Sequence, residues 1–194
     1  MSSGGQTTLQ LNVGINTFPF QSPGLPHVLS LCQTNGRFQD VQFPPNLRSL
    51  SGRGEKQVSA VYEVYVWKPP QAIYQGNYDV CSRNAVNPND LKQGSLGDCY
   101  FIAAMAALAE VPERIAKLIL SKEYNPFGVH AVTLYITGVW EDIIMDDLFP
   151  YDDSLQRAAF STSRTRDIWV MLLEKAFAKV NGGYKDIEAG FISE

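Results

Sequence analysis

The chain has 194 residues and a formal net charge of −4, with 45% of its residues hydrophobic and 19% charged. This composition is typical of a globular protein with a sizeable core. The negative charge argues against a nucleic-acid partner, and no apolar run reaches the roughly 18 residues that a membrane span requires. The three cysteines lie far apart and match no zinc spacing, and the N-terminus has no signal-peptide pattern, so we expect a reduced, cytoplasmic protein.

Residues 1–35 are rich in small and polar residues without a firm period. Only Thr7–Ile15 alternates well enough to predict a short strand, and the prolines and glycines at 19–26 break any continuation. We expect this segment to be a tail, or an extension that docks on the rest of the chain. His27 is interpreted as an exposed loop histidine.

Two extended segments and a turn-rich loop follow. Phe38–Asn46 contains two consecutive prolines, which favour extended backbone. Val58–Trp67 alternates as a strand does and is ended by another pair of prolines. Ile73–Asn89 is polar and rich in turn residues, and it leads directly into the most informative part of the sequence.

The stretch Lys92–Tyr100 combines two glycines, one cysteine and the start of an apolar run that reaches Leu108. This run predicts a buried helix that begins at or just before Cys99, with Asp98 as its cap. Backbone N–H groups and the helix dipole would favour a thiolate in that first turn. The Gln93 amide could donate a hydrogen bond to an oxyanion. The alternative is a small apolar cysteine packed at a helix start.

Three more elements are predicted downstream. A polar segment at 151–166, which includes a surface loop over Ser161–Arg166, separates the second from the third. The three elements are a helix from Pro112 to Ile119, an antiparallel hairpin of Val129–Ile136 and Val139–Met145, and a helix over Asp167–Val180 that two glycines end.

Asp146 and Asp147, at the end of the hairpin, are adjacent carboxylates that could be considered an acid/base pair. Neighbouring strand residues point to opposite faces, so the two would not share a site. We interpret them as carboxylates of a strand-end turn.

The sequence Gln93-Gly94-x-x-Gly97-Asp98-Cys99 followed by an aromatic resembles the nucleophile motif of the calpains, papain-like cysteine endopeptidases usually switched on by calcium. Tyr100 stands where the family commonly has tryptophan, which keeps a large aromatic. The resemblance covers about residues 36–194. It includes the segment Phe-x-Asp-x-x-Phe-Pro from Phe38 and the run from Trp169 to Tyr184.

The resemblance implies an α+β fold, the nucleophile lobe of a papain-like peptidase, with the Cys99 helix packed against the helix over 167–180. It implies that Cys99 is the nucleophile and Gln93 the oxyanion-hole donor, acting on protein or peptide substrates. Calpains carry their catalytic His and Asn in a second lobe. The resemblance to the first lobe stops at about Ile187, so we expect the second lobe to be absent from these 194 residues.

The resemblance also implies a calcium site. Asp90 lies nine residues before Cys99, where calpains place an acidic ligand, and Asp167 stands at the family's second acidic position. Calcium binds several oxygens, which two carboxylates and loop carbonyls could supply. Residues 83–85 are Arg, Asn and Ala where the family commonly has glycines. The alternative is that both aspartates are ordinary helix caps.

A thiol nucleophile needs a base to take its proton. His130 is the only histidine after Cys99, and in the calpain match it falls in a hairpin strand rather than at the catalytic histidine. The first functional hypothesis is therefore the nucleophile half of an intracellular calpain-like cysteine endopeptidase, inactive on its own. A non-catalytic calpain-like binding or regulatory module is the second, and an inert Cys99 in a purely structural relative is the third.

Overall fold

The structure is a computed structural model that describes residues 8–10, 24–52, 62–82 and 86–190. Its helices are α1 (Leu25–Asn35), α2 (Leu47–Ser51), α3 (Pro70–Ile73), α4 (Cys99–Ala109), α5 (Pro112–Leu118), α6 (Trp169–Asn181) and the short 3₁₀ helices η1 (Pro88–Asp90) and η2 (Lys185–Ile187). Its strands are β1 (Thr8–Gln10), β2 (Arg37–Gln39), β3 (Tyr65–Lys68), β4 (Leu91–Lys92), β5 (Val129–Ile136), β6 (Val139–Asp146), β7 (Phe149–Asp152), β8 (Arg157–Ala158) and β9 (Thr162–Ser163). The predicted α+β class is confirmed. Among these residues no helix combines the length and apolar character that a bilayer crossing requires.

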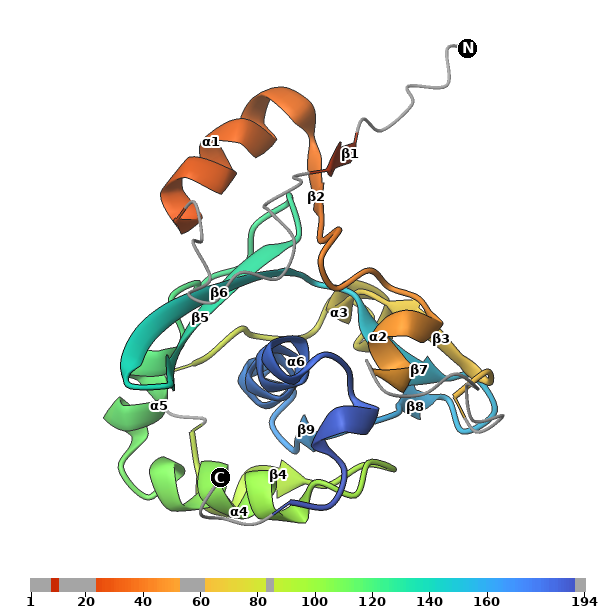
Figure 1. The fold of residues 1–194 in the computed structure, drawn as a ribbon, viewed down its shortest axis with the longest axis vertical. Coiled ribbons are helices and arrows are strands. Elements are labelled where there is room, and N and C mark those ends of the chain that lie inside the picture. The colour runs from red at the N-terminus through yellow and green to blue at the C-terminus, as the bar shows by residue number, and fades with distance from the viewer. Residues whose placement is uncertain (1–7, 11–23, 53–61, 83–85, 191–194) are drawn as a thin grey trace.

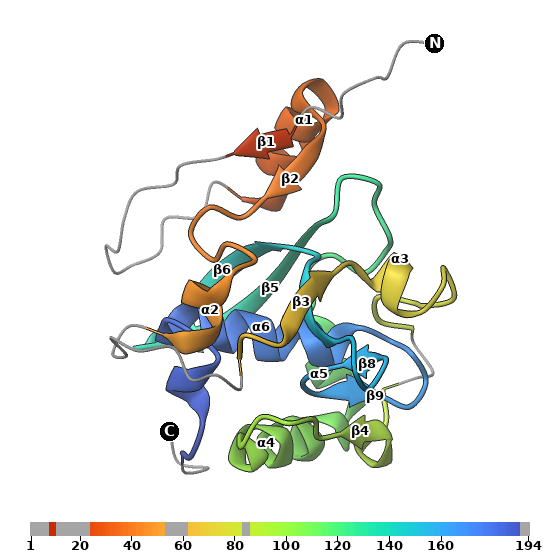
Figure 2. The same cartoon turned by 90° about the vertical axis from the view of Figure 1, so that its right-hand side faces the viewer.

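Helix α6 runs through the middle of the molecule, with the β5–β6 hairpin on one side and α4 on the other (Figures 1 and 2). Its sequence explains this place, because a helix with apolar residues on every side must be covered on every side. Trp169, Leu172 and Ala176 have no exposed surface. The helix predicted over 167–180 is confirmed with small shifts at both ends, and Gly182, in the left-handed region at φ 118°, ends it.

Two lysines of α6 are buried together with acidic partners. Lys175 Nζ donates to Asp146 Oδ1 at 2.6 Å and to the backbone oxygens of Asp146 and Leu148. One helical turn later, Lys179 Nζ donates to Asp40 Oδ2 at 2.6 Å. The backbone N–H of Asp40 in turn donates to Asp146 Oδ2 at 3.0 Å. One connected polar network therefore ties α6 to the hairpin and to the segment after β2.

The predicted hairpin and the helix predicted from Pro112 are both confirmed. Strands β5 and β6 pair antiparallel over 129–136 and 139–146. Thr137 and Gly138 join them at φ values of 48° and 92°, and a two-residue turn with positive φ matches the twist of paired strands.

The two adjacent carboxylates at the end of the hairpin form ion pairs with different basic side chains, so the prediction that they share no site is confirmed. Asp146 pairs with Lys175 of α6, whereas Asp147 pairs with Arg37 of β2. Both carboxylates are buried. They hold the hairpin against its neighbours.

Strand β4, which leads toward Cys99, pairs antiparallel with β9. The predicted surface loop over 161–166 is therefore wrong for its first half, since Ser161 and Ser163 are buried. Two contacts explain the burial: the ladder with β4, and a hydrogen bond from the Ser161 backbone N–H to the Glu174 side chain of α6.

The sequence does not predict α1, because Pro26 is a residue type that usually interrupts regular secondary structure. Proline is tolerated in the first helical turn, where backbone N–H groups have no partner within the helix, and Pro26 occupies that turn. Val28 and Cys32 of α1 pack into a buried cluster with Phe38 and Val129. Residues of α1 thus dock on β2 and the hairpin.

Two predicted strands lie partly outside the described residues. Of Thr7–Ile15, only β1 is described, and it pairs in parallel with β2. Of Val58–Trp67, the first four residues fall outside, and β3 begins at Tyr65 and ends just before Pro69. Strands β3, β7 and β8 form a three-stranded antiparallel sheet.

Candidate active site

Helix α4 begins at Cys99, as predicted, and Cys99 is exposed. The first turn therefore presents the thiol at the surface beside N–H groups that have no acceptor within the helix. The prediction of a buried helix is correct for one face only, because Met105 and Ala109 are buried whereas Ala103 and Leu108 are exposed. Among the described residues, α4 is covered from the side of α6 (Figure 1).

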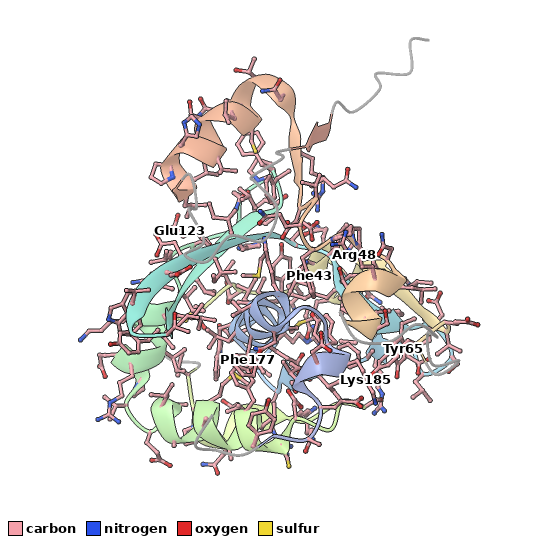
Figure 3. The ribbon with its side chains drawn as sticks, viewed as in Figure 1. Phe43, Arg48, Tyr65, Glu123, Phe177 and Lys185 are labelled. Carbon is pink, nitrogen blue, oxygen red and sulfur yellow. The ribbon has the colours of Figure 1, made fainter. Side chains whose placement is uncertain are left out.

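The predicted packing of α4 on α6 is confirmed by aromatic contacts. The rings of Phe101 and Phe177 stack with their centroids 4.4 Å apart, and Tyr100 meets Phe177 edge-on at 6.4 Å. Figure 3 shows Phe177 on the side of α6 that faces α4. The aromatic residue after the cysteine thus takes part in fixing the start of α4.

The loop that leads into α4 lies against the backbone of a neighbouring segment. The backbone N–H of Ser95 donates to the Ala159 carbonyl at 2.8 Å. A Cβ on Gly94 would lie 2.3 Å from the carbonyl carbon of Phe160, so this approach requires glycine. A Cβ on Gly97 would meet nothing within 4 Å. The first glycine is therefore a packing requirement, and the second leaves open space.

Gln93 belongs to the same loop and is exposed, like Cys99. Its Nε2 donates to the backbone oxygen of Leu96 at 2.9 Å, which holds the side chain within the loop. A side-chain amide has two N–H donors, so the second can serve an oxyanion.

Asp98 does not cap α4 with its side chain, and this prediction is wrong. The side chain is fully buried and lies within hydrogen-bonding reach of Glu174 of α6, which is buried as well. Burial is the main cause that raises the pKa of Asp98 to about 6. Burial, and then the charge of Asp98, raises the pKa of Glu174 well above its usual value.

Neither histidine lies beside Cys99. His130 is buried in β5, its Nδ1 is 3.1 Å from the Oγ of Ser121, and burial followed by the nearby positive charges lowers its pKa to about 4. Helix α6 separates β5 from α4. His27 is exposed as expected, but on α1, which lies at the opposite end of the molecule from α4 (Figures 1 and 2).

Neither acidic residue of the predicted calcium site caps a helix with its side chain. Asp167 is buried, and its Oδ1 accepts hydrogen bonds from the backbone N–H and the hydroxyl of Ser82, both at 2.7 Å. Asp90 is the last residue of η1, whose cap is Asn87, and its carbonyl accepts from the Arg164 N–H at 2.9 Å. In the described part of the chain, no three His, Cys, Asp or Glu side chains gather as a metal site.

Sequence reasoning missed two residues around the site, Glu174 and Ser82. A signal for Glu174 was present, because a carboxylate inside an apolar helix must find a buried partner. For Ser82 no local signal exists, since its partner Asp167 is distant in the sequence.

An exposed cysteine at the first residue of a helix, next to a loop that carries a side-chain amide, is compatible with the nucleophile role that the sequence predicts for Cys99. Comparison with known proteins identifies the family: the calpain family cysteine protease domain matches residues 38–194. The chain is 38% identical over 164 residues to the calpain-type cysteine protease DEK1 of Arabidopsis thaliana, and 30% identical over 183 residues to the calpain-1 catalytic subunit of Rattus norvegicus. The chain belongs to the calpain family of cysteine proteases.

The matches cover most of this chain but a small part of its relatives. They include 81% of the chain and 8% of the plant protein, and 92% of the chain and 25% of the rat protein. The chain therefore represents the cysteine-bearing part of a calpain protease core.

The packing of the loop predicts opposite outcomes for its two glycines. Gly94→Ala should destabilise the chain by about 1–3 kcal/mol, because the new methyl group collides with the backbone of Phe160. Gly97→Ala, with open space around it, should change stability by less than about 0.5 kcal/mol. Thermal melts of the two variants measure this, and equal losses in both would contradict the packing described.

Proposed function

We propose that this chain is the nucleophile half of an intracellular calpain-type cysteine endopeptidase that hydrolyses peptide bonds in protein or peptide substrates. The observation that carries the proposal is an exposed Cys99 at the first residue of α4, next to the loop that carries Gln93. In this reaction the Cys99 thiolate attacks the peptide carbonyl carbon. An amide N–H of Gln93 donates a hydrogen bond to the oxyanion that forms.

The reaction also needs a base for the thiol proton, and the two histidines of the chain are unsuited to this role. His130 is buried against Ser121, and His27 lies on α1. We therefore propose that a second lobe outside these 194 residues supplies the catalytic histidine and the asparagine that orients it, and that the chain alone is inactive.

We further propose that residues 36–194 form the lobe and that the preceding segment is an extension. The family match from residue 38 supports this boundary, and the burial of Val28 and Cys32 supports docking of α1 on the lobe. A cytoplasmic location is supported by three free cysteines, because reducing compartments keep thiols unpaired.

A non-catalytic binding or regulatory module is the second candidate function. It is favoured by the position of the histidines and by the bond from Gln93 to Leu96, which occupies one N–H of the proposed oxyanion donor. The activity experiment below separates this candidate from the first.

We also propose calcium binding at Asp90 and Asp167. The support is chemical: Asp167 is a buried carboxylate without a cation partner among the ion pairs of the described residues, and its Oδ1 accepts two hydrogen bonds from Ser82. Calcium takes about six to eight oxygen ligands, so loop carbonyls and waters would have to complete the set. A bound ion would neutralise the carboxylates and hold the loop before the nucleophile motif.

The first prediction from the proposed function concerns thiol reactivity. Cys99 should be alkylated first by limiting iodoacetamide at neutral pH, because it alone is exposed. Burial raises the pKa of Cys32, and burial and Asp167 raise the pKa of Cys81 to about 11, so roughly one Cys81 thiol in ten thousand is ionised at pH 7. Mass spectrometry of the labelled peptides measures the order, with urea-unfolded chain as control. Equal labelling of the three in the folded chain would contradict the proposed site.

The second prediction concerns catalysis. The chain alone should not cleave an unstructured peptide at a measurable rate, since a missing general base costs about 10²–10⁴-fold. Adding a histidine-bearing calpain lobe, in cis or as a separate chain, should create activity that Cys99→Ala abolishes. Gln93→Ala should reduce that activity by about 10²–10³-fold without unfolding the lobe.

Three outcomes would contradict this account of catalysis. Cleavage by the isolated chain that survives His130→Ala would show that another group is the base. Cleavage that is lost in His130→Ala would assign the base to His130. Continued inactivity after the second lobe is joined would favour the binding module.

The third prediction concerns calcium. If Asp90 and Asp167 share an ion, calcium at one hundred times Kd should raise the free energy of unfolding by about 2.7 kcal/mol, and the melting temperature should rise with it. The double variant Asp90→Asn/Asp167→Asn should lose this response. Asp142→Asn, an exposed acidic residue of β6, serves as the matched control. No shift in the unmodified chain at millimolar calcium would contradict the site.

A further inference from the structure

Two buried carboxyl groups lie close together next to Cys99, those of Asp98 and Glu174. Asp98 is 0% exposed and Glu174 is 2% exposed, and their side chains lie within hydrogen-bonding reach of one another. Within the described residues, Glu174 apart, neither oxygen of Asp98 has a hydrogen-bond partner. Two ionised carboxylates are not stable in such a place, because burial and mutual repulsion both oppose the second charge. One of the two must therefore keep a proton.

The other side of Glu174 is occupied by the segment that supports the Gln93 loop. Both oxygens of Glu174 lie 3.2 Å from the backbone N–H of Ser161. Ser161 directly follows Phe160, whose backbone lies against Gly94. Glu174 thus stands between the residue that precedes the cysteine and the segment on which the Gln93 loop rests.

In the described part of the chain, the ionisable neighbours of the pair are Glu188, Tyr184 and Lys175, and none of them neutralises the charge of the pair. Glu188, next to η2, adds negative charge and raises the pKa of Asp98 further. Tyr184 is buried, and burial together with the charges of Glu174, Asp146 and Asp98 keeps its pKa well above 10, so its phenol stays neutral. Lys175, the neighbour of Glu174 in α6, is bonded to Asp146 on another face of the helix.

We propose that Asp98 and Glu174 share a single proton at neutral pH and act as a positioning pair for the nucleophile, with the neutral Glu174 carboxyl donating to the Asp98 carboxylate. The same Glu174 accepts the Ser161 N–H, so the pair sets the position of Cys99 relative to the Gln93 loop. Neither residue touches a reacting group. The positioning role rests on the proposed function, whereas the shared proton does not.

The pair also makes the stability of the folded chain fall as the pH rises. The folded pKa of each carboxyl is raised, from 3.8 to about 6 for Asp98 and well above 4.5 for Glu174. Their contribution to stability is fully present below the unfolded values. It is lost as the pH rises through the folded values, because the unfolded chain then releases protons that the folded chain retains. Glu174→Gln can still donate to Asp98 and accept from the Ser161 N–H, and it should remove most of the loss of stability at high pH.

Infrared spectroscopy tests the shared proton directly. The unmodified chain at pH 7 should show the C=O absorption of a protonated carboxylic acid, and Glu174→Gln should lose it. Glu110→Gln, which changes an exposed glutamate at the end of α4, should keep it. Thermal melts between about pH 4 and 9 should show that Glu174→Gln gains stability over the unmodified chain as pH rises. Spectra without this absorption, or parallel stability curves, would overturn the shared proton.

The positioning role is tested by the rate at which iodoacetamide alkylates Cys99. Glu174→Gln should keep the rate of the unmodified chain, whereas Glu174→Ala, which leaves Asp98 and the Ser161 N–H without a partner, should change it several-fold. A folded Glu174→Ala chain with an unchanged rate would overturn the positioning role, as would a Gln variant that fails to keep the rate. If the Ala variant does not fold, the Gln variant decides alone. Failure of Cys99 to react first in the unmodified chain would instead contradict the proposed function.

Discussion

The buried ion pair between Lys175 and Asp146 is the constraint that orients the rest of the structure. Their side chains are 0% and 1% exposed, and removing such charges from water costs several kcal/mol per ion unless each finds good partners. Lys175 Nζ meets this condition with three acceptors between 2.6 and 2.9 Å, and the rings of Trp67 and Phe149 lie beside it. Because few arrangements satisfy a buried ammonium so fully, the rotation of α6 about its axis is fixed.

The fixed rotation of α6 determines which of its side chains face α4 and the candidate active site. Lys175 and Lys179 lie four residues apart on one face of the helix, toward the hairpin, which leaves Phe177 on the opposite face. There Phe177 stacks on Phe101 of α4, while Glu174 reaches Asp98. Ion pairs on one face of α6 therefore fix the helix, and contacts on its opposite face position the start of α4, where the cysteine lies.

The parts of the fold that the sequence predicts are those with local signals. Helix α4 follows from the apolar run after Cys99, the hairpin from the turn at Gly138, and the end of α6 from Gly182. The local sequence predicts that Asp98 caps α4, but its side chain lies against Glu174 instead. That contact could not be predicted locally, because Glu174 is 76 residues away in the sequence. The same holds for α1 and β9, which are fixed by distant partners. The motif predicts roles for Cys99 and Gln93, whereas no local signal predicts the contacts that support these two residues.

The central claim is that this lobe supplies the thiol while a histidine from elsewhere supplies the base. The pH profile of Cys99 alkylation tests it most directly, because a neighbouring imidazole allows the thiol to react at acidic pH as a thiolate–imidazolium pair. In the chain alone, the rate should rise through one ionisation with no acidic limb. When the histidine-bearing lobe is joined, an acidic limb should appear. An acidic limb in the isolated chain that disappears in His130→Gln would contradict the account.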